Sequence, residues 1–357
     1  MKKYLFFVGT LSSGGAERVI SILSSKMADC DMCVEILTYY DMPIFYEIHS
    51  KVRVSCIEQL TGTKNKIKNL IWLRKYFKEN AKVVISFLAP FNMMALVANL
   101  FTGIPIIVAD RNDPTRVPTN IVLRKIRDYL YHLADGVVLQ TKKNQAYFSK
   151  KVQQKSVVIY NPINLGKYSG AALNNEKDKV FVTAGRLMPQ KNQETMIKAF
   201  AKVVKRYPDY RLKIFGDGPS REKLEQLIKS QELENNIFLP GNTKSLHEEI
   251  KNARAFVLSS DYEGMPNALI EAMCLGLPVI STKVSGATDL IKDHENGLLI
   301  EISDEEALAH SMLELIEKPE LAEKLAKNAV KINNLLELNE IMAQWIQFIE
   351  KTTVEKQ

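Results

Sequence analysis

Apolar positions along this chain alternate between short β-branched runs and longer stretches with helical spacing, a pattern typical of parallel βαβ units. The short runs form two series, one in each half of the chain. The first series predicts strands at 4–9, 34–38, 52–57, 83–88, 104–109, 136–140 and 156–160. The second predicts strands at 180–184, 212–215, 237–240, 255–259, 279–281 and 297–300.

Residues 161–178 separate the two series; they contain two glycines and little apolar periodicity, which indicates a linker. Helices are expected at about 303–317 and 320–352. We therefore predict an α/β protein of two doubly wound, Rossmann-like domains, 1–165 and 166–335. The last residues, 336–357, are expected to pack back on the first domain as a helix. In such sheets ligands bind outside the carboxyl ends of the strands, here in a cleft between the domains.

Length and composition fit this picture, since 357 residues with 46% hydrophobic content exclude a disulfide-stapled mini-protein and a disordered chain. The net charge of +7 is unevenly distributed. Residues 1–165 hold 23 Lys and Arg against 12 Asp and Glu, a net +11. Residues 166–357 hold 25 against 29, a net −4. The first domain therefore has a basic surface.

Targeting signals are weak. The apolar run after the first lysines is too short for a signal peptide, and no stretch reaches the length of a membrane span. The four cysteines suggest neither a disulfide framework nor a zinc site. A reduced, cytoplasmic protein is expected.

Three segments that follow predicted strands carry candidate chemistry. Gly14 and Gly15 open a helix after the first strand, an arrangement that fits a tight turn or a phosphate loop equally well. In residues 185–192, Arg186 and Lys191 lie five residues apart on one loop, where they suit a diphosphate better than plain solvent.

The third segment, residues 263–273, is the most specific. Pro266 suits a first helical position, so the amides that follow it would form an anion-receptive helix N-terminus. Glu263 precedes this helix and Glu271 lies in its second turn. A pair of carboxylates could serve a retaining glycosidase, but its placement beside a phosphate-type site favours recognition of sugar hydroxyls.

Together these segments resemble the retaining glycosyltransferases of family 4, which have the GT-B fold. The resemblance extends over nearly the whole chain. Its further motifs are Phe-Gly-Asp-Gly-Pro at 215–219, Leu-Pro-Gly at 239–241, Gly-Leu-Pro-Val at 276–279 and Asn-Gly-Leu-Leu at 296–299.

The resemblance implies roles for these residues. Arg186 and Lys191 would hold the donor diphosphate, Glu263 the hydroxyls of the donor sugar and Glu271 the nucleotide ribose. Further donor contacts are implied for Gly14, Gly15, Gly185, Gly241, Asn242, Asn267 and Ala268. The donor phosphate itself takes the acceptor proton in the front-face mechanism that the family favours, so neither a protein nucleophile nor a cofactor is required.

One position departs from the family pattern. Many relatives carry a histidine after the fifth strand, where this sequence has Asp110 and Arg111. Arg111 is therefore a candidate catalytic residue that could contact the donor sugar or the acceptor. Neither the five histidines nor Asp29-Cys30-Asp31, which is expected to be a surface turn, suggests a metal ligand set, and no catalytic metal is predicted.

A basic helix is predicted at about 64–79. On a wheel at roughly 100° per residue, its lysines cluster on one side around Ile71. These lysines are Lys64, Lys68, Lys75 and Lys78. Another face would pack on the sheet through Ile67, Leu70, Leu73 and Phe77. Such a helix suits an anionic membrane surface, although a solvated face would look the same. Nucleic acid is not expected, because no recognition motif is present.

These observations predict a metal-independent retaining transferase, cytoplasmic and peripheral at the inner face of the cell membrane. It would move a hexose or N-acetylhexosamine from a UDP-sugar, with GalNAc, Gal or GlcNAc favoured, to a polyprenyl-diphosphate-linked saccharide for a surface polysaccharide or glycan. The alternatives are a nucleotide-sugar epimerase of the same fold and a non-enzymatic protein that binds membranes or polyanions.

Overall fold

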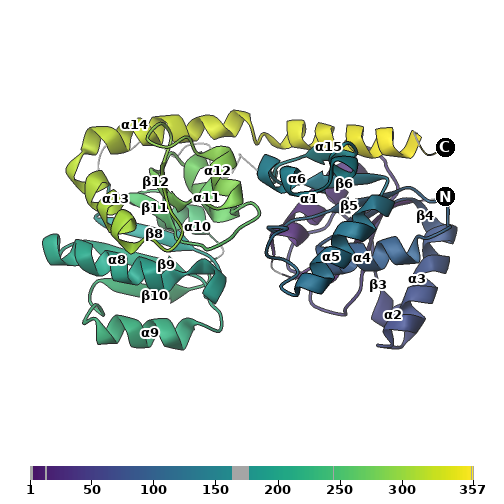
Figure 1. The fold of residues 1–357 in the computed structure, drawn as a ribbon, viewed down its shortest axis with the longest axis horizontal. Coiled ribbons are helices and arrows are strands. Elements are labelled where there is room, and N and C mark those ends of the chain that lie inside the picture. The colour runs from purple at the N-terminus through teal and green to yellow at the C-terminus, as the bar shows by residue number, and fades with distance from the viewer. Residues whose placement is uncertain (1–2, 13, 163–176, 244, 355, 357) are drawn as a thin grey trace. The chain divides into compact units, whose positions relative to one another are not determined.

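The computed structural model describes residues 3–12, 14–162, 177–243, 245–354 and 356. The chain divides into two compact units, each built on a parallel sheet (Figure 1). The N-terminal unit comprises Met1–Pro162 and Leu338–Gln357, and the C-terminal unit comprises Ile163–Glu337. These boundaries differ by three and two residues from those expected at 165 and 335. Most of the expected linker, 161–178, lies outside the described residues.

The sheet of the N-terminal unit has seven parallel strands in the order β3-β2-β1-β4-β5-β6-β7. The strands are β1 (Lys3–Val8), β2 (Val34–Thr38), β3 (Arg53–Cys56), β4 (Ala81–Phe87), β5 (Ile106–Ala109), β6 (Gly136–Leu139) and β7 (Ser156–Val158). The central strands are buried on both faces, which explains their continuous apolar runs. The strand order reverses between β1 and β4.

Helices cover both faces of this sheet. One face packs against α1 (Gly15–Asp29) and α15 (Leu338–Val354), and the other against α3 (Lys66–Asn80) and α4 (Ala89–Ala98). Next to α4 lies α5 (Ile121–Leu130), so α3, α4 and α5 form one layer (Figure 1). The shorter helices are α2 (Ile57–Thr61), α6 (Lys142–Tyr147) and α7 (Lys150–Gln153), with a 3-10 turn at Tyr131–Leu133.

Helix α15 belongs to the N-terminal unit because its apolar residues are part of that unit's core. Trp345 is buried and its ring stacks on that of Phe87, with 5.7 Å between the centroids. The single helix expected at 320–352 is wrong. The segment divides into α14 (Pro319–Ala329), a 3-10 helix (Val330–Asn334) and α15, since Asn333 and Asn334 are poor helix formers.

The C-terminal unit has a six-stranded parallel sheet in the order β10-β9-β8-β11-β12-β13. Its strands are β8 (Val180–Ala184), β9 (Arg211–Phe215), β10 (Ile237–Gly241), β11 (Ala255–Leu258), β12 (Val279–Thr282) and β13 (Leu298–Ile300). Its helices are α8 (Gln193–Arg206), α9 (Arg221–Ser230), α10 (Leu246–Ile250), α11 (Asn267–Cys274), α12 (Ser285–Leu290), α13 (Glu305–Glu317) and α14, with a 3-10 turn at Pro189–Lys191. The strand order reverses between β8 and β11.

All thirteen strands expected from the sequence are present in the described part of the chain, and the fold class is confirmed. In a doubly wound sheet, ligands bind outside the carboxyl ends of the strands, at the point where the strand order reverses. That point lies between β1 and β4 in one unit and between β8 and β11 in the other.

Candidate active site

Two loops flank the reversal point of the C-terminal sheet. The β8 loop, residues 185–192, follows β8, and the β11 loop, residues 259–266, follows β11. Because β8 and β11 are hydrogen-bonded neighbours, these loops meet although about 70 residues separate them in the sequence. The structure thereby brings together Lys191 and Glu263, while Arg186 lies on the same loop as Lys191.

An ion pair joins the two loops. The ammonium of Lys191 lies 2.5 Å from Oε1 of Glu263, and the two side chains are only 20% and 10% exposed. The same carboxylate oxygen accepts a hydrogen bond of 2.8 Å from the hydroxyl of Ser260. This arrangement holds a cation and a hydrogen-bond acceptor side by side, so it is able to bind an anion and a hydroxyl at adjacent positions.

Neutral side chains fasten the loops to each other. Asn192 begins α8 in a left-handed conformation, with φ of 47°; its amide accepts from the hydroxyl of Thr195 at 2.9 Å and donates to Asp261 at 2.8 Å. Gln190 donates to the carbonyl of Tyr262 at 2.8 Å. Asn tolerates this backbone conformation better than most residues. Asn192 is the last residue of the 185–192 segment, and the sequence assigns it no role.

The glycines of the 215–219 motif allow the β9 loop to lie against the β8 loop. Gly216 has φ of +128°, and a Cβ there would lie 2.0 Å from the carbonyl oxygen of Gly185. The amide of Gly185 donates to the carbonyl of Phe215 at 3.0 Å. Close backbone packing therefore requires glycine at 216 and fixes the start of the β8 loop.

Helix α11 begins at Asn267, one residue later than expected. Pro266 is the residue before the helix rather than its first residue, with ψ of 96° and no side-chain cap. Pro266 has no backbone N–H to donate, so the amides at the N-terminus of the helix are those of Asn267 and Ala268 in its first turn. Glu271 lies in the second turn, as the spacing predicted, and the structure shows that it is partly buried. The side chain of Arg186 is exposed.

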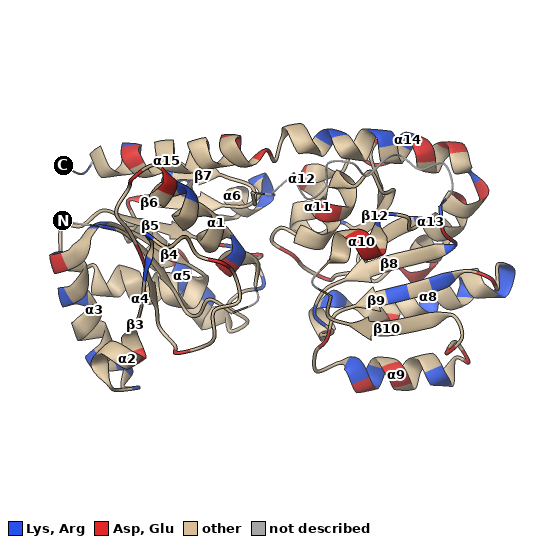
Figure 2. Cartoon of the chain, turned by 180° about the vertical axis from the view of Figure 1, so that it is seen from behind, with Lys and Arg blue, Asp and Glu red and all other residues tan. Residues whose placement is uncertain are grey.

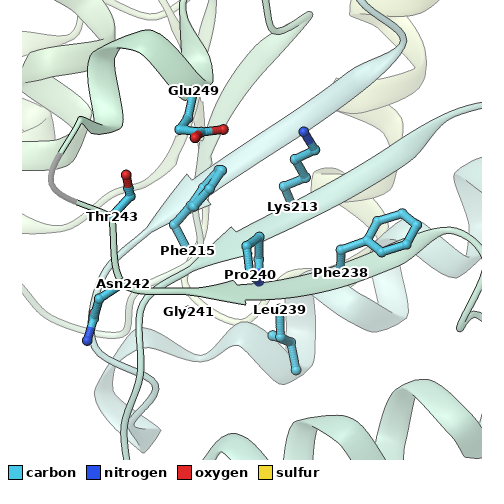
Figure 3. Close-up of a pocket in the computed structure, with 9 residues that line it drawn as sticks. All are labelled: Lys213, Phe215, Phe238, Leu239, Pro240, Gly241, Asn242, Thr243 and Glu249. Carbon is cyan, nitrogen blue, oxygen red and sulfur yellow. The ribbon is translucent and has the colours of Figure 1, made fainter.

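A pocket of about 530 Å³ lies on the outer edge of the same sheet (Figure 3). Gly241 and Asn242, expected to lie against a base, line one end of it. The further lining residues are Lys213, Phe215, Phe238, Leu239, Pro240, Thr243 and Glu249. Its size is that of a small-molecule site. The sequence signal was period-two alternation in β9, where Lys213 and Phe215 oppose the core residues Leu212 and Ile214.

In the N-terminal unit, Gly14 and Gly15 lie at the carboxyl end of β1, beside the reversal point. Gly14 precedes α1 in an extended conformation, and a Cβ there would lie 2.1 Å from a carboxylate oxygen of Glu17. The hydroxyl of Tyr46 donates to the carbonyl of Gly14 at 3.1 Å. Glycine at 14 therefore makes room for Glu17 at the helix start.

Arg111 is buried at the carboxyl end of β5. Its guanidinium donates to the side-chain oxygen of Asn161, which also accepts from Gln140 at 2.8 Å. Two of its nitrogen atoms, Nε and Nη1, have no hydrogen-bond partner among the described residues. Burial lowers the pKa of Arg111 to about 9. The three residues follow β5, β6 and β7, so polar groups gather along this edge of the sheet.

Asp110 has the opposite surroundings. It is buried, and its Oδ2 accepts a hydrogen bond of 3.0 Å from Tyr131 and lies 3.8 Å from the guanidinium of Arg127. Burial raises the pKa of Asp110. Its other carboxylate oxygen, Oδ1, is buried without a hydrogen-bond partner among the described residues. Both Asp110 and Arg111 therefore keep unpartnered polar atoms at this end of the sheet.

Basic residues of α3 are exposed, as expected. Lys68, Lys75 and Lys78 lie on the surface of α3, and Figure 2 shows basic residues along this helix. The helix begins two residues later than expected, at Lys66, so Lys64 is exposed in the loop before it. One apolar expectation was wrong. Ile67 is 71% exposed, because the buried stripe contains Asn69, Leu73 and Phe77 instead.

Among the described residues, no cluster of three His, Cys, Asp or Glu side chains is arranged to hold a metal ion. No helix in that part of the chain is both long and apolar enough to cross a membrane.

Comparison with known proteins places this geometry in a class. Residues 167–332 match the family model of the glycosyl transferases group 1. The structure of Anabaena HepE in complex with UDP and glucose superposes with a TM-score of 0.85 at 19% identity, covering 98% of this chain and 100% of that one. A sucrose-phosphate synthase from Thermosynechococcus elongatus gives a TM-score of 0.84 at 19% identity, covering 99% and 100%. The chain is a glycosyltransferase with the GT-B fold.

The sequence relatives are more specific. A Campylobacter jejuni protein named GalNAc-alpha-(1->4)-GalNAc-alpha-(1->3)-diNAcBac-PP-undecaprenol alpha-1,4-N-acetyl-D-galactosaminyltransferase is 28% identical over 98% of each chain. An uncharacterized glycosyltransferase of Methanocaldococcus jannaschii is 30% identical over 63% of this chain and 65% of its own length. This chain is thus similar to bacterial and archaeal glycosyltransferases over most or all of its length.

Proposed function

We propose that this glycosyltransferase moves a hexose or N-acetylhexosamine from a UDP-sugar to a polyprenyl-diphosphate-linked saccharide, with retention of anomeric configuration. GalNAc, Gal and GlcNAc are the donors to test first. The product would be a surface polysaccharide or glycan. The observation that carries the proposal is the Lys191–Glu263 pair at the reversal point of the C-terminal sheet.

In this proposal the donor lies across the β8 and β11 loops. Lys191 and Arg186 hold the diphosphate, and the amides of Asn267 and Ala268 at the start of α11 add partial positive charge. Glu263 accepts hydrogen bonds from the sugar hydroxyls, and Glu271 from the ribose. The base lies at the Gly241–Asn242 end of the pocket, against Phe215. The contact of Lys191 with Glu263 keeps both side chains oriented before the donor binds.

The reaction in the proposed mechanism needs few protein groups. The acceptor oxygen bonds to the anomeric carbon on the face from which UDP departs, and the bond between that carbon and the diphosphate oxygen breaks. A phosphate oxygen of the donor takes the acceptor proton. Lys191 and Arg186 neutralise the charge that grows on UDP, which lowers the barrier without a protein nucleophile. The same cations make a metal ion unnecessary in this proposal.

The N-terminal unit would serve the acceptor. The Campylobacter relative is named for an undecaprenol-diphosphate-linked acceptor, and the net +11 of residues 1–165 suits such a diphosphate and an anionic lipid surface. Gly14, Gly15 and Arg111 lie at the carboxyl end of that unit's sheet. In the proposal Arg111 contacts the donor sugar or the acceptor, the exposed lysines of α3 face lipid headgroups, and the protein is peripheral at the inner face of the cell membrane.

The test is a transfer assay with a panel of UDP-, GDP- and ADP-sugars and a short polyprenyl-diphosphate-linked saccharide. UDP release that depends on the acceptor, with an unchanged anomeric configuration by NMR and no loss in EDTA, is expected. Turnover of the donor without acceptor would instead identify an epimerase. Lipid binding with no UDP release from any donor would identify a non-enzymatic protein that binds membranes. An inverted product would refute the retaining mechanism.

A further inference from the structure

Helix α5 of the N-terminal unit presents its apolar side chains to solvent. In this helix, which the structure describes completely, Arg127 is the only buried residue. Val122 is 60% exposed, Ile126 44% and Tyr129 73%. These three residues are spaced i, i+4 and i+7, so they share one helix face. An amphipathic helix of a globular domain normally turns such a face toward the core, and here it is reversed.

Polar bonds hold α5 in this orientation. The guanidinium of Arg127 donates to the carbonyls of Pro114 (2.9 Å) and Val117 and pairs with Asp128 (2.6 Å). Because Arg127 is 0% exposed and well satisfied, it fixes the inner side of the helix together with the partly buried Leu130. The outer face is therefore available to a partner.

The surroundings of this face are basic. Lys125 is exposed on α5 next to the apolar residues. On α3, which lies in the same layer with α4 between them, Ile67 and Ile71 are 71% and 66% exposed among lysines (Figure 1). Apolar residues beside cations are typical of helices that lie in the plane of a membrane interface, and tyrosine is enriched at that depth.

We infer that the outer face of α5, formed by Val122, Ile126 and Tyr129, inserts into the headgroup region of an anionic lipid bilayer, with α3 and its lysines beside it. The inference deepens the proposed function and rests on it for the acceptor. A second copy of the chain fits less well, since two such basic faces repel each other. An anionic bilayer satisfies the apolar residues and the cations together.

The geometry connects this face to the candidate site. The chain leaves β5 at its carboxyl end, where Arg111 lies, and reaches α5 after residues 112–120. An acceptor whose lipid tail stays in the bilayer must present its diphosphate near the surface. Docking through α5 would bring the loop that carries Arg111 close to that diphosphate.

The test measures partition of the full chain onto vesicles of phosphatidylglycerol and phosphatidylethanolamine by co-sedimentation, without donor. Replacing Val122 and Ile126 together by Asp should weaken partition by at least about tenfold, since charges at an apolar contact oppose insertion. Val354→Asp is the matched control, because Val354 is 71% exposed on α15, which packs on the opposite face of the sheet. It should leave partition within about twofold of wild type.

Two further variants test the charge and the membrane insertion of this face separately. Lys125→Gln should weaken partition about fivefold on the anionic vesicles and leave phosphatidylcholine vesicles unaffected. Tyr129→Trp should gain fluorescence that brominated lipids quench, a readout that does not depend on an Asp variant folding. Unchanged partition of the double variant together with no quenching would overturn the inference. A dimer in solution that the double variant converts to monomer would overturn it too, in favour of a second copy.

This test is independent of turnover. If no donor gives UDP release but the partition results hold, the membrane face stands while the proposed transfer reaction falls. If wild type transfers sugar while the double variant partitions like wild type, the membrane face alone falls.

Discussion

Replacing Gly216 by alanine tests how the β8 loop is held in place. A Cβ at 216 would lie 2.0 Å from the carbonyl oxygen of Gly185 and 2.9 Å from its carbonyl carbon. These atoms are backbone and cannot rotate away, so the β8 loop must move by roughly 1.5 Å to restore an ordinary contact of roughly 3.5 Å. The φ of +128° adds about 1–3 kcal/mol of strain for a residue with a side chain.

The displacement should appear in catalysis. Gly185 begins the loop that carries Lys191, and a Cβ at 185 would lie 3.2 Å from Cε of that lysine, so the two residues are in close contact. A misplacement of about 1 Å in a positioning element typically costs about 10²-fold in rate. We therefore expect kcat/KM for the donor to fall about 100-fold in Gly216→Ala, with a loss of about 2–4 kcal/mol in the free energy of unfolding.

Gly62→Ala is the matched control for backbone strain. Gly62 has φ of +63° at the end of α2, in the N-terminal unit, and nothing lies within 4 Å of its would-be Cβ. This variant should lose only about 1–2 kcal/mol and keep its donor kinetics. Urea unfolding and initial rates of UDP release measure both effects. If Gly216→Ala kept full donor kinetics, or lost no more stability than Gly62→Ala, the close packing would not position the loop.

Three further outcomes are expected. Lys191→Met should lower donor turnover at least about 100-fold and weaken donor binding, because it removes the cation and leaves Glu263 without its ion pair. Trp345→Ala should cost the N-terminal unit about 3–5 kcal/mol in urea unfolding, because it empties a fully buried site against the sheet. Although burial opposes ionisation of Glu35, hydrogen bonds from Lys3, Tyr76 and Ser55 hold its pKa below the ordinary value. Its contribution to stability should be complete above pH 4.5 and lost as the pH falls further.

Each of these has its own comparison. Lys202→Met removes a lysine paired with Glu305 and Glu306 on the surface and should leave turnover unchanged; equal losses in both lysine variants would point to general damage. If Trp345→Ala lowered the free energy of unfolding in urea by less than about 1 kcal/mol, that would contradict the core role of α15. The acid-dependent loss should be smaller in Glu35→Gln than in wild type, and identical pH profiles would remove Glu35 as its source.

The sequence predicts the strands well because each is a short apolar run bounded by polar or glycine-rich turns. It also places Lys191 and Glu263 just after strands. The sequence does not show that β8 and β11 are neighbours in the sheet. That pairing brings Lys191 and Glu263 together as an ion pair. The pairing depends on strand order, a property of the whole sheet. For the same reason the bonds from Gln190, Asn192 and Ser260 have no local signal beyond their position in loops.

The helices show where periodicity fails. The wheel for α3 treats polar residues as outward, but Asn69 is buried, since its amide donates to the hydroxyl of Tyr39 at 3.2 Å and to the carbonyl of Thr63 at 3.1 Å. A satisfied buried amide rotates the buried stripe and turns Ile67 outward. In α5, the buried and hydrogen-bonded Arg127 occupies the inner face, and the apolar residues Val122, Ile126 and Tyr129 face outward. In both cases a polar residue with specific partners overrides the apolar pattern.

The two units use charge in different ways. Residues 166–357 carry a net charge of −4, yet the proposed diphosphate site is there. This is consistent, because the effect of a cation on a leaving group depends on its placement and partial burial rather than on the net charge of the surface. Lys191 is 20% exposed and Glu263 balances it, so the unit needs no excess of basic residues. In the proposed contact with lipid headgroups, the exposed lysines of α3 would act instead through their number and would be screened by salt. Added salt should therefore weaken binding to anionic vesicles far more than it weakens binding of the donor.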